Sequence, residues 1–213
     1  MSTPQRSVGI ENTQRIWARF AGFLFILVLI TDLLGMKIVS NSAAHEMQLY
    51  RFGLCIELVG SVGVVFLAMG LYVALKPVNS DLALLALFFR IIEASGAFLM
   101  VYAFDAGPRG SAASASGTNI AAIFFSIGST IFFYLFWKSK YIPRFLSVLG
   151  LLASVMVIFA STGALLWPNR AETLQAGWLP IALAELLVGL WLVFKGIGKS
   201  TENDSAGSAL QRP

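Results

Sequence analysis

The 213-residue sequence is poor in residues that bind metals or perform covalent chemistry. It has one cysteine, Cys55, and one histidine, His45. One cysteine cannot form a disulfide within the chain, and the two residues together cannot supply the ligands of a zinc site. The sequence also lacks a G-x-S-x-G elbow, an H-E-x-x-H pair and a phosphate-binding loop. We therefore name no metal, no cofactor and no catalytic residue, and the balance is against an enzyme.

Charge is also scarce. Only 12% of the residues are charged and 57% are hydrophobic, whereas soluble domains carry about 25% charged residues. A soluble fold of this size could not bury so much apolar surface, so the expected surroundings are the lipid bilayer. The net charge of +4 does not indicate nucleic acid, because the basic residues lie at the ends of apolar runs, where membrane topology places them.

Long apolar runs dominate the chain. Each is about 18–24 residues long, and a membrane-spanning helix needs about 20. They lack the alternation of barrel strands, so helices are the expected structure. The predicted fold is all-α, an integral membrane bundle of about six transmembrane helices. The six runs cover residues 17–39, 52–75, 82–105, 118–137, 145–167 and 178–195.

The distribution of lysine and arginine predicts the orientation in the membrane. Ten of these residues fall on one side of the six runs and four on the other. Because the basic side faces the cytoplasm, both termini are expected to be cytoplasmic, in a multi-pass protein of the inner (cytoplasmic) membrane. The ten are Arg6, Arg15, Arg19, Lys76, Lys138, Lys140, Arg144, Lys195, Lys199 and Arg212; the four are Lys37, Arg51, Arg109 and Arg170.

This topology divides the chain into three parts. Residues 1–16 are a cytoplasmic N-terminal segment, residues 17–197 form the transmembrane domain, and residues 198–213 form a polar cytoplasmic tail with the composition of a disordered segment. The first apolar run also has some features of a signal peptide, with Arg15 and Arg19 before it and small residues after it. It continues through Asp32 to Val39, which is longer than a usual signal-peptide core.

The ionisable residues inside the runs are the candidate ligand- or proton-binding residues. Each costs about 2.5–3.5 kcal/mol at a bilayer centre, so they should face the bundle interior or water. At about 1.5 Å per residue, the acids of the first, second and sixth runs reach a similar level in the outer half of the bilayer. The pair in the third run falls near the midplane. The five candidates are Asp32, Glu57, Arg90, Glu93 and Glu185.

The charges of these five residues sum to −3 if all are ionised. A dry site cannot hold that charge, so the acids must be protonated, hydrated or neutralised by a bound cation. Arg90 and Glu93 are three residues apart and can pair within one helix. A purely structural role for that pair is the alternative to a functional one.

Five stretches of the chain form a recognisable set. They are RFGLCIEL (51–58), LYVALKPVN (71–79), FFRIIEA (88–94), YIPR (141–144) and ELLVGLWLVFKG (185–196). Together they resemble one bacterial membrane-protein family, catalogued as domain of unknown function 4386. The resemblance covers about residues 12–197 and implies a six-helix membrane protein, but it implies no activity. The third and sixth runs also each carry a glutamate followed shortly by glycine, a similarity that would fit an inverted repeat of three plus three helices.

Three functions fit these features. The first is a carrier or binding protein for a small solute or cation that uses the acidic cluster, since intramembrane acids mark ion pathways and proton relays. The second is a non-catalytic component for membrane assembly, stress response or sensing, in which the charges fix helix pairing. The third is a lipid-modifying enzyme with Glu57 and Glu185 as acid and base.

Overall fold

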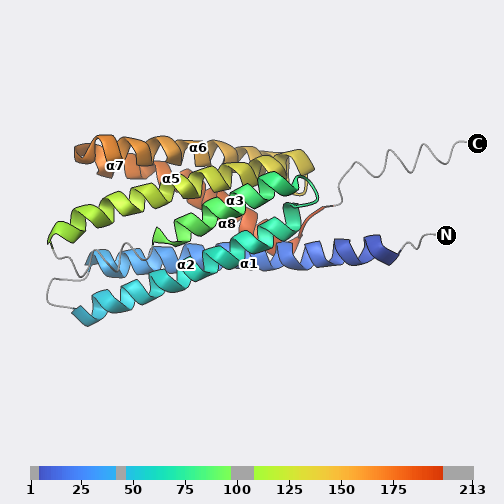
Figure 1. Ribbon diagram of the computed structural model, residues 1–213, viewed down its shortest axis with the longest axis horizontal. Coiled ribbons are helices and arrows are strands. Elements are labelled where there is room, and N and C mark those ends of the chain that lie inside the picture. The colour runs from blue at the N-terminus through green and yellow to red at the C-terminus, as the bar shows by residue number, and fades with distance from the viewer. Residues whose placement is uncertain (1–4, 42–46, 97–107, 199–213) are drawn as a thin grey trace, which may run out of the picture.

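The computed structural model describes residues 5–41, 47–96 and 108–198, and within these residues the secondary structure consists of helices joined by short turns, without a strand. Six main helices and three short helical pieces follow one another along the chain (Figure 1). The main helices are α1 (Gln5–Asn41), α2 (Met47–Leu75), α3 (Ser80–Ala94), α5 (Pro108–Ser139), α6 (Arg144–Leu166) and α8 (Leu179–Phe194). The short pieces are η1 (Pro168–Arg170), α7 (Ala171–Gln175) and η2 (Ala176–Trp178).

Five helical segments of the described chain are long and apolar enough to cross a membrane. They are Asn12–Val39, Met47–Leu75, Gly117–Ser139, Arg144–Leu166 and Ala176–Phe194. The remaining predicted span, residues 82–105, overlaps α3, which has 15 residues and begins two residues earlier. Most of the rest of that run, from residue 97, lies outside the described residues. The predicted all-α membrane bundle is confirmed.

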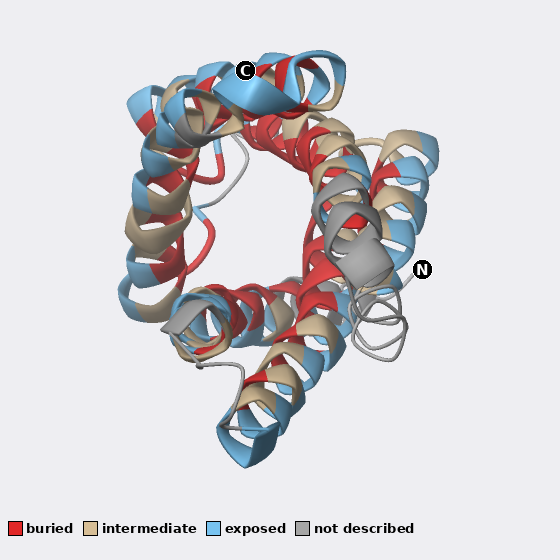
Figure 2. Cartoon of the chain, turned by 90° about the vertical axis from the view of Figure 1, so that its left-hand side faces the viewer, coloured by how far each residue is buried: buried red, intermediate tan, exposed pale blue. Residues whose placement is uncertain are grey.

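The main helices form a ring in which each one packs against the next along the chain. Contacts link α1 to α2, α2 to α3, α3 to α5, α5 to α6 and α6 to α8, and the last helix closes on the first. Seen along the helices, the buried residues lie mainly on the inner faces of this ring (Figure 2). The start of α1 and the end of α8 lie at the same end of the bundle (Figure 1). We call this end the terminal end and the other the distal end.

Glycines allow the closing contact between α1 and α8. A β-carbon at Gly22 would lie 2.8 Å from the carbonyl oxygen of Gly189, and one at Gly189 would lie 3.1 Å from the carbonyl oxygen of Gly22. The two backbones therefore touch, as small residues permit where membrane helices cross. Around this crossing α1 buries Ala18, Ala21 and Phe25. The first apolar run is thus part of the core of the bundle.

Local signals mark several helix ends. Helix α5 begins at Pro108, ten residues before the fourth predicted run, 118–137. The Asn79 side chain caps α3 by accepting a hydrogen bond of 2.9 Å from the backbone N–H of Leu82. Pro143 precedes α6, and Pro168 follows it. The link between α6 and α8, which lies between two predicted runs, folds into η1, α7 and η2 at the distal end.

Candidate functional site

The centre of the candidate site is an ion pair on α3. Arg90 Nη1 lies 3.0 Å from Glu93 Oε2, one helical turn further on. Only 3% of Arg90 and 17% of Glu93 is exposed. Glu93 Oε2 is buried and makes no hydrogen bond despite this contact, and the same holds for Arg90 Nε. Arg90 and Glu93 therefore form an ion pair, but part of their hydrogen-bonding capacity is unused.

Helix α5 supplies the other partners of Arg90. Arg90 Nη1 donates a hydrogen bond of 3.3 Å to Ser129 Oγ, and the guanidinium carbon lies 4.7 Å from the centre of the Phe125 ring. Gly128 makes room for this contact, because a β-carbon there would lie 3.2 Å from Arg90 Cγ. Phe125 in turn stacks on Trp178, with ring centres 5.8 Å apart. Arg90 thus joins α3 to α5, and Phe125 joins α5 to the start of α8.

Two further carboxyl groups meet at the contact between α1 and α2. A β-carbon at Gly60 would lie 2.5 Å from Asp32 Oδ1, and one at Gly35 would lie 2.6 Å from Glu57 Oε1. Each acid therefore packs against the glycine of the opposite helix. The arrangement is reciprocal because both helices carry the same spacing, an acid followed three residues later by glycine. The spacing places the acid and the glycine on one face of each helix.

Glu185 brings α8 into the same cluster. Its Oε1 atom is buried and has no hydrogen-bond partner. The Glu185 carboxyl interacts electrostatically with Arg90 and with Asp32. Asp32 also interacts electrostatically with Arg90, Glu93 and Glu57, so it is the carboxyl shared by the whole group.

The structure therefore brings together all five candidates named from the sequence. They come from α1, α2, α3 and α8, toward the distal end of the bundle. At about 1.5 Å per residue, Asp32 is about 14 Å and Glu57 about 15 Å from the distal ends of their helices. Glu185 is about 9 Å from the start of α8. Among the described residues, no group of three or more His, Cys, Asp or Glu is arranged to hold a metal ion.

Sequence reasoning missed the neutral residues that complete the site. Ser129 and Phe125 contact Arg90. Ser126 and Thr130 donate to carbonyl groups of their own helix, at 2.6 and 2.7 Å. The repeated acid–glycine spacing was the available signal for the contact between α1 and α2. No comparable signal in the sequence distinguishes Ser129 from its neighbours.

Comparison with known proteins places the whole bundle in one family. An uncharacterised protein of Archaeoglobus fulgidus is 29% identical over 135 residues, which cover 62% of this chain and 76% of the relative. No solved structure matches the chain. The model of a family described as a domain of unknown function matches residues 19–106 and 109–196, and each range holds three of the six main helices. The chain therefore belongs to the family of domain of unknown function 4386.

Proposed function

We propose that the protein binds a small cation, or a small solute that carries a proton, at the cluster of Asp32, Glu57, Arg90, Glu93 and Glu185, and moves it across the membrane. The observation that carries this proposal is the excess of carboxyl groups around one buried guanidinium. Fully ionised, the cluster holds a charge of −3 in a region of low dielectric constant, which a cation or protons would neutralise.

Two carboxyl oxygens of the cluster lack a hydrogen-bond partner, which supports a bound ligand rather than a purely structural role. Glu185 Oε1 and Glu93 Oε2 are buried without a hydrogen bond. Buried polar atoms normally have a partner, so each such atom calls for a physical explanation. A bound ammonium group or an added proton would supply the missing donor to these oxygens.

Transport is tested with the purified protein in liposomes that enclose a pH-sensitive dye. We expect proton movement, driven by a pH gradient or by a gradient of tetramethylammonium, potassium or sodium ions, that falls at least tenfold in Glu185→Gln and Asp32→Asn. Asp81→Asn is the matched control, because Asp81 is an exposed acid in the first turn of α3, away from the cluster. Equal flux in all four proteins, or flux no higher than in empty liposomes, would contradict the proposal.

A structural role for the cluster is the second candidate, and the partners of Arg90 favour it. Arg90 joins α3 to α5 through an ion pair, a hydrogen bond and a ring contact. If the acids serve only to balance this charge, Glu185→Gln should lower the free energy of unfolding by about 3–5 kcal/mol, as breaking a buried pair does. If the acids are retained for a ligand, the same change should leave stability unchanged or raise it. Unfolding in mild detergent at neutral pH distinguishes the two.

A further inference from the structure

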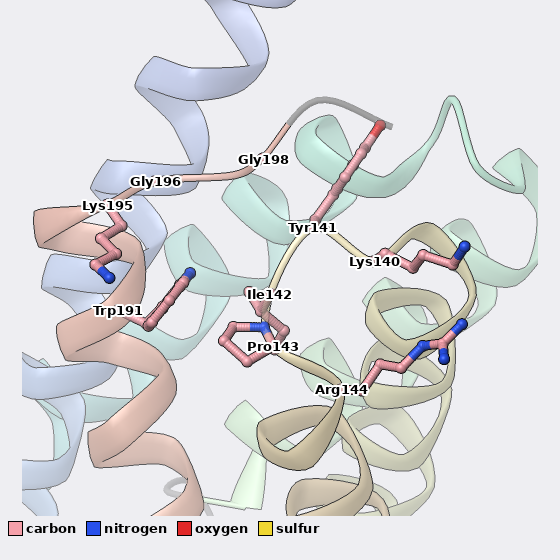
Figure 3. Close-up of a pocket in the computed structure, with 9 residues that line it drawn as sticks. All are labelled: Lys140, Tyr141, Ile142, Pro143, Arg144, Trp191, Lys195, Gly196 and Gly198. Carbon is pink, nitrogen blue, oxygen red and sulfur yellow. The ribbon is translucent and has the colours of Figure 1, made fainter. Parts of the chain in front are cut away.

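A pocket of about 400 Å³ lies at the terminal end of the bundle, far from the acidic cluster. Its walls are the turn between α5 and α6, residues 140–143, and the end of α8 (Figure 3). Arg90 and the four acids do not line it. The pocket therefore has to be explained separately from the proposed transport function.

Backbone hydrogen bonds fix the shape of this pocket. The N–H of Gly198 donates to the carbonyl of Tyr141 at 3.1 Å, which ties the end of the described chain to the turn. The N–H of Gly196, at φ +70°, donates to the carbonyl of Leu192 at 3.1 Å and so closes α8. Tyr141 and Ile142, two residues of the turn, are buried. These contacts hold the walls of the pocket in place.

The polar groups of the pocket are suited to an anion. Lys140 and Arg144 lie on one side of Pro143, and Lys195 lies on the other (Figure 3). The residues that line the pocket include three cations and no acid. Helix α6, 23 residues long, begins at Arg144 without a side-chain cap, so its N-terminus adds partial positive charge. Lys140 and Arg144, together with the N-terminus of α6, favour a phosphate group on their side of Pro143, and Lys195 adds a cation on the other side.

The apolar surroundings indicate that this phosphate belongs to a lipid. Phe145 follows Arg144 and is 66% exposed, and Phe194 precedes Lys195 and is 76% exposed. These rings stand at the ends of two membrane-spanning helices, the level at which headgroups meet acyl chains. The Lys195 ammonium lies 4.4 Å from the centre of the Trp191 ring, which fixes a cation at that level.

We propose that this pocket binds the phosphate headgroup of an anionic phospholipid, with the acyl chains lying along the exposed rings of Phe145 and Phe194. Basic pockets between membrane helices on the cytoplasmic side suit such headgroups. The lipid would bridge the turn before α6 and the end of α8.

The test uses the full chain in mixed micelles of phosphatidylglycerol and phosphatidylcholine, and native mass spectrometry counts the lipids that stay bound. We expect the wild-type protein to retain phosphatidylglycerol in preference. Each of Lys140→Gln, Arg144→Gln and Lys195→Gln should reduce that preference about fivefold, the contribution of one basic residue near an anionic surface. Arg170→Gln is the matched control, because Arg170 is an exposed cation at the distal end, and it should leave the preference unchanged.

Inorganic phosphate distinguishes a lipid from a free anion. In micelles of phosphatidylcholine alone, phosphate at millimolar concentration should raise the melting temperature less than phosphatidylglycerol does. Equal protection by phosphate, no preference for the anionic lipid, or an equal loss in Arg170→Gln would overturn the proposal. Gel filtration checks that each variant is folded. If the other two variants misfold, Lys195→Gln still tests the proposal, because Lys195 is exposed at the end of α8 and its substitution should leave the fold intact.

Discussion

Arg90 is the residue on which the cluster depends. It is the partner of Glu93 at 3.0 Å and interacts electrostatically with Asp32 and Glu185. Arg90→Met keeps most of the side-chain volume but removes the positive charge from a region of low dielectric constant. We expect it to lower the free energy of unfolding by about 3–5 kcal/mol, as for a buried pair that loses one member.

Chemical unfolding in detergent measures this loss, and a second substitution shows its origin. Adding Glu93→Gln to Arg90→Met should recover part of the stability, because the uncompensated carboxyl is then removed as well. Lys76→Met is the control, since Lys76 is an exposed cation at the end of α2. A double variant as unstable as the sum of the two single variants would show that the pair is not coupled.

The backbone of Lys140 has a strained conformation. Its φ angle is +57°, a left-handed conformation that costs a non-glycine residue about 1–2 kcal/mol. Lys140→Gly should therefore raise the free energy of unfolding by about 1 kcal/mol while weakening the preference for anionic lipid. Lys138→Gly, two residues earlier in the last turn of α5, should instead lower it by about 1 kcal/mol. Thermal unfolding of the two variants shows whether the sign depends on the backbone angle.

Among the helix contacts, that of α1 with α8 brings two backbones together at Gly22. A β-carbon at Gly22 would lie 2.8 Å from two backbone atoms of α8, neither of which can rotate away. We expect Gly22→Ala to cost about 1–3 kcal/mol, as for overpacking in a core. Gly163→Ala on α6 is the matched control, because its nearest neighbour is the flexible end of Leu174 at 3.1 Å. Thermal unfolding of both variants measures the difference, and equal melting temperatures would contradict this account of the crossing.

At the same scale, the sequence predicted where the helices lie along the chain better than which helices contact one another. Hydropathy and length located the spans because the bilayer requires about 20 apolar residues. Rise per residue also placed Asp32, Glu57 and Glu185 at one level. Periodicity gives the face of a helix but not the helix it meets, so the contact of Arg90 with Ser129 could not be predicted. The contact of Gly35 with Glu57 did have a signal, the repeated acid–glycine spacing, although the prediction from sequence did not include it. The short helices α7, η1 and η2 were missed because they are too short to show an apolar period.

Considered as a whole, the molecule has two chemically different ends. The terminal end carries Lys76, Lys140, Arg144 and Lys195, and the acidic cluster lies toward the distal end. The excess of lysine and arginine predicts that the terminal end faces the cytoplasm, and this orientation stays a prediction.

Cysteine labelling in intact cells checks the orientation. Cys55 is the one cysteine of the sequence and is exposed, so Cys55→Ala gives the background. In that background Asn169→Cys, between α6 and α8, should react with a membrane-impermeant maleimide. Asn79→Cys, between α2 and α3, should react only after the cells are opened. The reverse pattern would invert the topology.

The closed ring has a consequence for how the protein is made. Every contact of the ring but one joins helices that are consecutive along the chain, so these pairs can form as the chain emerges, with low contact order. Asp32 can pack against Gly60, and Glu57 against Gly35, as soon as α2 is inserted. Glu185 arrives with α8, the helix that also closes the circle on α1. A ribosome that stops before residue 179 therefore leaves an open arc of helices whose charged cluster lacks its last member, and only a completed chain carries the full site.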